Sequence, residues 1–396
     1  MSERRAGLGV VLVAAATTML AGWVLKAPCL GPWADGRQYN RLCYSDVVAL
    51  YHSEDRDRGL DEDRVPYIDG ENEYPVLTGV TMWLAALPAT SYASFFNWTA
   101  VLLMGAALAT ASLLFRVVGD RALFFALAPT LLIYGLVNWD LLAVALATAG
   151  TAAFLRGRDA PAGAYLGAGA AAKLYPGLLA LPFALDRLGD GRRRDAIRIV
   201  AAAAAVWAAI NLPLALFGFD RWSEFFTFNS ARTADWDSVW FFVARHLDFT
   251  WDLAALNALT AGAFAAAVVV VWVLARRRRP RFPPWTFGFP LLVAFLLTGK
   301  VYSPQYGLWL LPWFALTLPN LRLFVAFELA DIAVFVTRFQ FFAGYADVGP
   351  GLPFWAFETA VLVRAAVLIA CVVAWIRTPT VELNTEPDAA LLREAA

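Results

Sequence analysis

The strongest candidate for acid or base chemistry is an aspartate shortly after the first hydrophobic segment. Asp46 lies in the run Tyr44-Ser45-Asp46-Val47. A carboxylate at a membrane boundary loses part of its hydration, which raises its pKa toward the range where it acts as a general base. The alternative is an N-cap, because an Asp side chain accepts backbone N–H bonds at a helix start. The sequence leaves both interpretations open.

Two more charged residues lie at the edges of short hydrophobic segments. Asp140 follows an Asn-Trp pair in a very short turn, where a carboxylate is costly unless it is partnered or functional. Lys173 lies between two half-length apolar segments, so its ammonium must reach an interface, a carboxylate or a phosphate. An N-cap role for Asp140 and snorkelling of Lys173 are the structural alternatives.

A loop at 219–249 combines aromatic and charged residues. Its chemically interesting members are Arg221, Trp222, Arg232, Asp235, Trp236, Asp237, Trp240, Arg245 and His246. Aromatic planes beside carboxylates suit a sugar, which offers apolar faces and hydroxyls. Trp is also the usual anchor at a bilayer interface, which is the alternative for these tryptophans. The lone histidine does not indicate a catalytic group.

A polar turn at 300–306 supplies a second candidate phosphate ligand, Lys300. The turn reads Lys300-Val301-Tyr302-Ser303-Pro304-Gln305-Tyr306. Its neighbours are hydrophobic on both sides, so we expect it to connect two membrane helices.

Charged residues also lie inside the last two hydrophobic segments. Glu328 and Asp331 share one helical face at three-residue spacing, and Glu358 and Arg364 lie in the final segment. Arg364 facing Asp331 would satisfy both charges. We therefore predict a structural ion pair here, with a proton relay as the alternative.

The composition predicts that membrane helices position these residues. Of 396 residues, 60% are hydrophobic and 16% charged, and the mean hydropathy is +0.58, which excludes an ordinary soluble domain. Net charge is formally zero, so nothing indicates nucleic acid. Two His and three Cys are too few for a zinc cluster. Carboxylates could hold a divalent cation, but no pattern indicates one, and we predict no metal or cofactor.

The hydrophobic pattern predicts an all-α, polytopic membrane protein with about twelve transmembrane helices. They are expected near 8–26, 95–117, 121–137, 140–156, 161–172, 175–187, 196–218, 250–275, 284–299, 304–318, 321–339 and 354–376. A shorter segment, 75–89, is bounded by prolines and is expected to lie along the outer interface. Residues 1–377 form one transmembrane domain in this interpretation, followed by a disordered cytoplasmic tail at 378–396.

Basic residues assign the sides of the membrane. Short loops rich in Arg fall on one side if the N-terminus is cytoplasmic, and the long loops at about 27–94 and 219–249 fall outside. This division requires separate helices on either side of Lys173. Both termini are then cytoplasmic, and the candidate site is extracytoplasmic.

The first outer loop contains Cys29 and Cys43, which could form a disulfide in an oxidising compartment or remain free thiols. The acidic run at 54–63, with interleaved arginines, is expected to be a solvated loop. Residues 8–25 resemble a signal peptide without a cleavage site, so we expect an uncleaved first helix.

In this order the motifs resemble those of the GT-C superfamily of polyprenyl-phosphate-sugar-dependent glycosyltransferases, and most closely the bacterial alpha-mannosyltransferases of glycosyltransferase family 87 (DUF2029). The resemblance covers most of the hydrophobic region. It rests on Asp46, Glu73-Tyr74-Pro75-Val76-Leu77, Asn138-Trp139-Asp140-Leu141-Leu142-Ala143, Ala172-Lys173-Leu174-Tyr175-Pro176, Leu181-Pro182, Asp237-Ser238-Val239-Trp240, Ser303-Pro304-Gln305-Tyr306 and Leu311-Pro312. Where family members often carry histidines after the Ser-Pro element, this chain has Gln305, Tyr306 and Trp309.

The resemblance implies transfer of a sugar, mannose by family analogy, from a polyprenyl-phosphate donor to an envelope glycolipid or glycan, with inversion. Asp46 would be the catalytic base, and Lys173, Arg232 and Lys300 would bind the donor phosphate. The residues that would bind sugar or acceptor are Glu73, Tyr74, Asp140, Trp240, Tyr302 and Gln305.

Two other classes of function fit a membrane protein of this kind. A lipid or solute transporter, or a flippase, would also have many helices and buried charges, but transporters place their sites at mid-bilayer between internal repeats. A non-catalytic scaffold of the cell envelope is the third class. The clustering of the candidate charges at one face favours the transferase.

Overall fold

A computed structural model describes residues 7–33, 35–51, 65–68, 70, 72–379 and 383, and this part of the chain is helical, with one isolated β-bridge between Pro66 and Gly70. The predicted all-α class is confirmed. The acidic run at 54–63 and most of the tail at 378–396 lie outside the described residues.

Five segments of the described chain are long and apolar enough to cross a membrane: Leu8–Cys29, Tyr92–Ala126, Arg193–Phe217, Leu253–Arg278 and Phe354–Arg377. The molecule is therefore a multi-pass membrane protein. Each segment contains one long helix, and α18 is similarly long but more charged. These six long helices are α1 (Leu8–Lys26), α5 (Tyr92–Val118), α12 (Arg193–Phe217), α15 (Leu253–Arg278), α18 (Leu321–Tyr345) and α19 (Phe354–Arg377). All lie close to their predicted positions.

Several other predicted helices are short or broken. They appear as η2 (Gly119–Ala122), α6 (Leu123–Ala126), α7 (Pro129–Tyr134), α8 (Asp140–Leu155), α9 (Asp159–Ala172), α10 (Tyr175–Leu178), α11 (Ala180–Gly189), η3 (Pro284–Phe287), α16 (Gly288–Thr298), η4 (Pro304–Trp309) and α17 (Leu311–Thr317). Proline opens many of these pieces, because its missing N–H and fixed φ suit a first turn but not a helix interior. The single helix expected at 121–137 is wrong for this reason: Pro129 starts a new helix.

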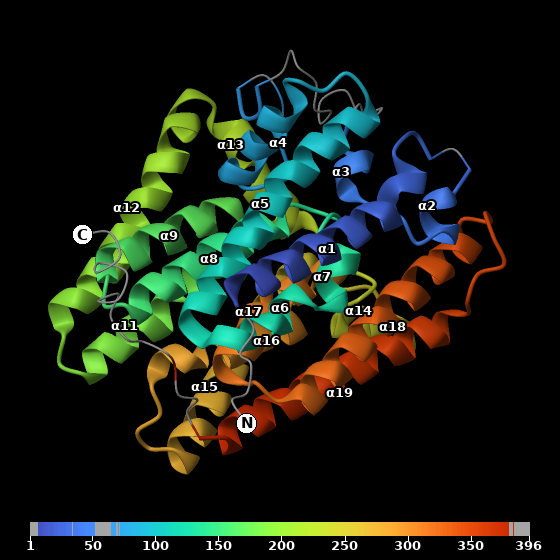
Figure 1. Ribbon diagram of the computed structural model, residues 1–396. Helices are drawn as coiled ribbons and strands as arrows, with labels where there is room; N and C mark the ends of the chain where they lie inside the picture. The colour runs from blue at the N-terminus through green and yellow to red at the C-terminus, as the bar shows by residue number, and fades with distance from the viewer. Residues whose placement is uncertain are drawn as a thin grey trace.

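The predicted outer segments are more ordered than the sequence indicates. The expected interfacial helix is α4 (Val76–Ala86), and the remaining elements are η1 (Ala27–Cys29), α2 (Arg37–Asn40), α3 (Asp46–Ala49), α13 (Phe219–Ala231) and α14 (Val239–His246). The loop expected at 219–249 thus contains two helices. Figure 1 shows α2, α3 and α4 toward one side of the molecule, and the start of α1 and the end of α19 toward the other.

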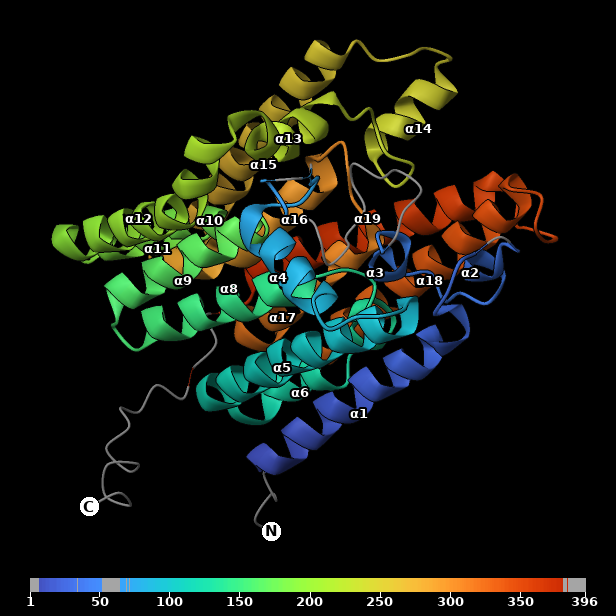
Figure 2. The same ribbon diagram turned by 90° about the horizontal axis from the view of Figure 1, so that it is seen from above.

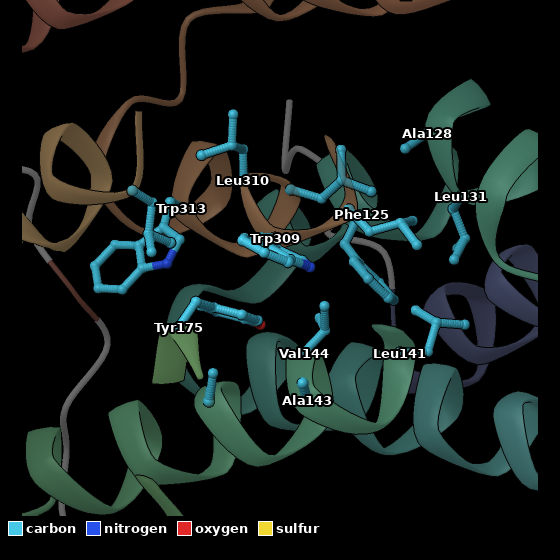
Figure 3. Packing of buried hydrophobic residues seen from close by; sticks show 14 of the residues in the cluster. Phe125, Ala128, Leu131, Leu141, Ala143, Val144, Tyr175, Trp309, Leu310 and Trp313 are labelled. Carbon is cyan, nitrogen blue, oxygen red and sulfur yellow. The ribbon is translucent and has the colours of Figure 1, made fainter. Parts of the chain in front are cut away.

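Tight packing in the centre holds the short helices in place. The rings of Tyr175 and Trp309 stack with centroids 4.3 Å apart, at the middle of the buried cluster drawn in Figure 3. On the flank, α9 crosses α12 so closely that a Cβ at Gly163 or Gly167 would lie 2.1 or 2.2 Å from a backbone oxygen of α12. Small residues permit such close helix contacts in membranes.

The two cysteines of the first outer segment form a disulfide. Cys29, at the end of η1, bonds to Cys43, with the Cα atoms 5.8 Å apart. Of the two alternatives that the sequence leaves open, the disulfide is present. It joins the end of the first transmembrane segment to the residues just before α3.

Candidate functional site

A cavity of about 420 Å³ lies at the side of the molecule where α3, α4 and α13 are found. In the view of Figure 2, α4 lies near the middle of the molecule, with α3 to its right and α13 higher in the picture. Its lining is polar and aromatic: Tyr39, Tyr44, Asp46, Glu73, Tyr74, Pro75, Tyr134, Val137, Asn138, Lys173, Phe225, Phe228, Asn229, Arg232, Asp235, Trp236, Ser303, Pro304, Gln305, Tyr306, Arg338, Phe339 and Phe342. Segments far apart in the sequence therefore meet around one space.

Asp46 is held in the cavity wall by its backbone and by its side chain. Its N–H donates to the carbonyl of Val137 at 2.8 Å, and the hydroxyl of Ser45 donates to the carbonyl of Leu136 at 2.7 Å. Its two carboxylate oxygens accept from the Tyr44 hydroxyl and from the Asn138 amide, each at 2.7 Å. The N-cap interpretation is wrong, because Asp46 is the first residue of α3 and its side chain caps no backbone N–H.

The environment of Asp46 suits a base. Burial raises the pKa of this carboxyl, while the bonds from Tyr44 and Asn138 and the charge of Lys173 act in the opposite direction, and the net pKa lies above its ordinary value. Asn138 also donates to the Tyr74 hydroxyl at 2.9 Å. The carboxylate is thus fixed in one orientation at the edge of the cavity.

Lys173 reaches the same cavity through the break between α9 and α10. Its backbone is extended, which separates the two helices as the sequence predicts. Its ammonium lies 3.3 Å from the Asp140 carboxylate. The ring centroids of Tyr74 and Tyr306 are 5.5 and 5.2 Å from the same ammonium. Burial is the largest single effect on Lys173 and lowers its pKa, but the charge of Asp140, its hydrogen bond, Tyr306 and Asp46 together outweigh burial. The net pKa is therefore raised, and the residue is cationic.

Asp140 lies beneath this lysine and not in the cavity lining. Its side chain is fully buried, and its second oxygen accepts from the Trp309 indole at 2.7 Å. The expected direct contact with sugar or acceptor does not agree with this position. The N-cap alternative does not hold either, because Asp140 is the first residue of α8 and makes no cap bond. Asp140 instead fixes the orientation and charge of Lys173.

The cavity lining also contains two arginines, each paired with a carboxylate. Arg232 lies 3.4 Å from Asp235, and Arg338 forms an ion pair with the buried Asp237. Burial raises the pKa of Asp237 to about 6, against the opposing effect of Arg338. Arg338 was not among the residues predicted from the sequence. Its signal was the spacing of seven residues from Asp331, which places both on one face of α18.

The structure divides the remaining predicted residues into two groups. Glu73, Tyr74 and Gln305 line the cavity. Lys300, Trp240 and Tyr302 do not.

Lys300 has other partners, which explains why the predicted phosphate contact does not fit. Its ammonium donates to the carbonyls of Ser230 and Arg232 at 3.0 and 2.7 Å and to the Asn257 side chain at 2.6 Å. These bonds hold the end of α13. Trp240 likewise donates to the carbonyl of Thr298, at 2.8 Å.

A second charged cluster is sealed between α18, α19 and α7. Arg364 lies 3.2 Å from Asp331, so the predicted ion pair is confirmed. The guanidinium lies 3.8 Å from the ring centroid of Tyr302, and that tyrosine does not line the cavity. Glu328 accepts from the backbone N–H of Thr130 at 2.7 Å. In the described residues, no group of three or more His, Cys, Asp and Glu is placed to hold a metal ion.

The fold and the cavity define a class: a multi-pass membrane protein whose cavity, at one side, combines a fixed carboxylate with several cations. The particular family follows from comparison with known proteins. A family model described as "Glycosyltransferase family 87" matches residues 73–304, which is more than half of the chain, so the chain belongs to glycosyltransferase family 87. The predicted resemblance is confirmed, and the protein is a glycosyltransferase.

Two solved structures are similar to this one at low identity. ArnT from Cupriavidus metallidurans bound to undecaprenyl phosphate has 15% identity and a TM-score of 0.42, with 94% of this chain and 77% of that chain covered. The apo state of the same protein has 14% identity and a TM-score of 0.44, with 93% and 76% covered. Among curated proteins, none matches the sequence.

Proposed function

We propose that the protein transfers a sugar from a polyprenyl-phosphate donor to a hydroxyl of an envelope glycolipid or glycan, with inversion at the anomeric carbon. Mannose is the sugar we expect, by family analogy. The observation that carries the proposal is the shared cavity: Asp46 lines the same space as Lys173, Arg232 and Arg338. A base for the acceptor and cations for a departing phosphate are what this reaction requires.

In the proposed step, Asp46 takes the proton from the acceptor hydroxyl as its oxygen attacks the anomeric carbon. The bond from that carbon to the phosphate oxygen breaks, and the lipid phosphate leaves with the electron pair. Lys173 stabilises the growing negative charge on the phosphate, and it stays cationic because Asp140 raises its pKa. Positioning and electrostatics suffice, and the enzyme needs no covalent intermediate.

The two arginines of the cavity lining extend the phosphate site in this proposal. Arg232 lies at the end of α13, and Arg338 is held by Asp237. Lys300 takes part only by holding the backbone of Ser230 and Arg232.

Aromatic side chains beside Asp46 suit the sugars. Tyr44 stacks on Phe339 with centroids 5.2 Å apart, and both rings line the cavity together with Trp236. Glu73 and Gln305 add polar groups that can bind hydroxyls. The acceptor in this proposal lies between the aromatic wall and the base.

The proposed site faces the extracytoplasmic side, and both termini are cytoplasmic. The disulfide between Cys29 and Cys43 supports this orientation, because disulfides persist in oxidising compartments and the bond lies close to Asp46 in the sequence. Single cysteines at exposed Asp220 and Arg277, in intact cells, test it with a membrane-impermeant maleimide. Labelling at 220 and protection at 277 are expected, and the reverse result contradicts the orientation.

Transfer itself can be measured directly. Membranes with the protein are incubated with radiolabelled polyprenyl-phosphate-mannose and a glycolipid extract, and labelled product is counted. Asp46→Asn keeps the size of the side chain but removes the base, so transfer should fall by about 10²–10⁴-fold. Asp220→Asn, an exposed change on α13, is the matched control and should retain activity. Undiminished transfer by Asp46→Asn would exclude Asp46 as the base.

A further inference from the structure

A lysine at the end of the first transmembrane helix is fully buried next to the candidate base. Lys26 exposes 0% of its surface, so its ammonium does not reach water. The ammonium donates to the carbonyl of Tyr44 at 2.9 Å and lies 5.1 Å from the ring centroid of Phe335. Its one hydrogen-bond acceptor in the described residues is therefore a neutral carbonyl.

Burying a lysine in this way is unfavourable unless another interaction compensates. A lysine at a helix end usually extends along the helix and places its ammonium in water, and Lys26 does not. Its ammonium bonds to the residue two positions before Asp46, so the buried lysine contacts the segment that carries the candidate base.

Tyr44 connects the lysine to the base. Its carbonyl accepts from Lys26, and its hydroxyl donates to Asp46 at 2.7 Å. The disulfide fixes the same two segments, because Cys29 follows Lys26 closely and Cys43 adjoins Tyr44. The end of α1 therefore holds the segment Cys43-Tyr44 in two ways: through the disulfide and through the hydrogen bond from Lys26.

We propose that Lys26 is a positioning residue for the proposed transfer: its buried ammonium fixes the Tyr44 backbone and supplies a positive charge that keeps the carboxylate of Asp46 ionised. This inference rests on the proposed function of Asp46 as base. It assigns a role to a residue that does not line the cavity and that no step of the reaction uses.

Groups from several elements act on the ionisation of Asp46. Lys26 comes from α1, Tyr44 from the segment before α3, Tyr74 from the segment before α4, Asp140 from α8, Lys173 from the break before α10, and Arg338 faces Tyr44 from α18. A base works in its ionised form, so transfer rises with pH through the pKa of Asp46. Loss of a nearby positive charge raises that pKa, and the acid limb of the pH profile moves to higher pH.

The test is the pH profile of transfer from radiolabelled polyprenyl-phosphate-mannose. Lys26→Gln keeps a donor for the Tyr44 carbonyl but removes the charge. If the pKa of Asp46 rises by about one unit, transfer by Lys26→Gln on the acid limb should be about tenfold lower than that of wild type at the same pH. On the alkaline plateau, the variant should lose little activity. Lys26→Arg keeps the charge and should keep the wild-type limb. A Lys26→Gln profile that coincides with wild type overturns the proposal.

A double variant covers the case in which Lys26→Gln does not fold. If Lys26 compensates the charge of Asp46, then Lys26→Gln combined with Asp46→Asn should regain the thermal stability that Lys26→Gln loses, because the carboxylate is also gone. Stability losses that simply add contradict an electrostatic role. Formation of the disulfide, measured by thiol labelling, reports folding in each variant.

The two proposals fail in different ways. If Asp46→Asn transfers sugar as wild type does, the proposed function of Asp46 is wrong. If Asp46→Asn is inactive but Lys26→Gln leaves the acid limb in place, only the role of Lys26 is wrong.

Discussion

Two buried ion pairs in this molecule have nearly the same geometry and different surroundings. Lys173 lies 3.3 Å from Asp140, and Arg364 lies 3.2 Å from Asp331; each carboxylate side chain is 0% exposed. The cations differ. The Lys173 side chain is 14% exposed and lines the cavity, whereas that of Arg364 is 1% exposed and sealed between helices.

The difference separates a pair that can act on a ligand from one that holds the fold. Lys173 has room beside it for a phosphate, and Asp140 keeps it charged and in place. Arg364 packs against the ring of Tyr302 and forms its ion pair with Asp331. Asp331 also accepts a hydrogen bond from the Thr130 hydroxyl at 3.1 Å. The distance within each ion pair does not distinguish the two roles. Whether the cation lines the cavity does distinguish them.

The sharpest test of this comparison is to break the sealed pair. Arg364→Met leaves Asp331 buried without its cation, so the free energy of unfolding should fall by about 3–5 kcal/mol. Thermal unfolding in detergent measures this loss. Arg364→Met combined with Asp331→Leu removes both charges and should regain most of the stability. A single variant as stable as wild type contradicts a structural role for the pair.

Breaking the cavity pair should affect activity instead. Lys173→Gln removes the cation proposed to stabilise the leaving phosphate, so kcat should fall by about 10²–10³-fold. Gln still offers an N–H donor to Asp140, and water can enter from the cavity at the 14% exposed Lys173 position. The melting temperature should therefore fall less than in Arg364→Met. Arg277→Gln is the control, because this exposed cation of α15 is not part of the cavity lining, and its transfer rate should stay near wild type. Equal losses in the two variants contradict the assignment of Lys173.

The positions of the long helices were largely predictable because the length of a hydrophobic run is a property of local sequence. The limits of α1, α8 and α19 agree with the apolar runs within a few residues. The helix predicted at 121–137 is wrong, because Pro129 divides that apolar run into α6 and α7. The helices α13 and α14 were missed because their mixed aromatic and polar composition resembles an interfacial loop.

The site was predictable only in part, because convergence of distant segments is a tertiary property. Asp46 and Lys173 stood out as charges beside apolar runs, and both line the cavity. Lys300 stood out for the same reason but bonds to the end of α13, which no spacing indicates. Arg338 was not predicted, because its spacing from Asp331 indicates only a shared face of α18, and the packing of that helix decides that this residue lines the cavity.

Asp140→Asn tests how far the cavity pair depends on its buried partner. Asp140 raises the pKa of Lys173, so an uncharged Asn lowers that pKa and Lys173 loses its proton at lower pH. The alkaline limb of transfer should therefore move to lower pH. Some misplacement of Lys173 should add a loss of up to about a hundredfold in rate. An alkaline limb that stays in place shows that Asp140 does not control the charge of Lys173.

Tyr44→Phe should give the smallest effect, because it removes one hydrogen bond to Asp46 and leaves the bond from Asn138. The Tyr44 hydroxyl favours the ionised carboxylate, so its loss raises the pKa of Asp46 and moves the acid limb of transfer to higher pH. The alkaline plateau should remain within a few fold of wild type, since the base is still present there. Tyr134→Phe, which changes another tyrosine of the lining, is the control and should leave the limb in place. A Tyr44→Phe profile lowered equally at every pH would mean that the hydroxyl binds substrate and does not tune the base.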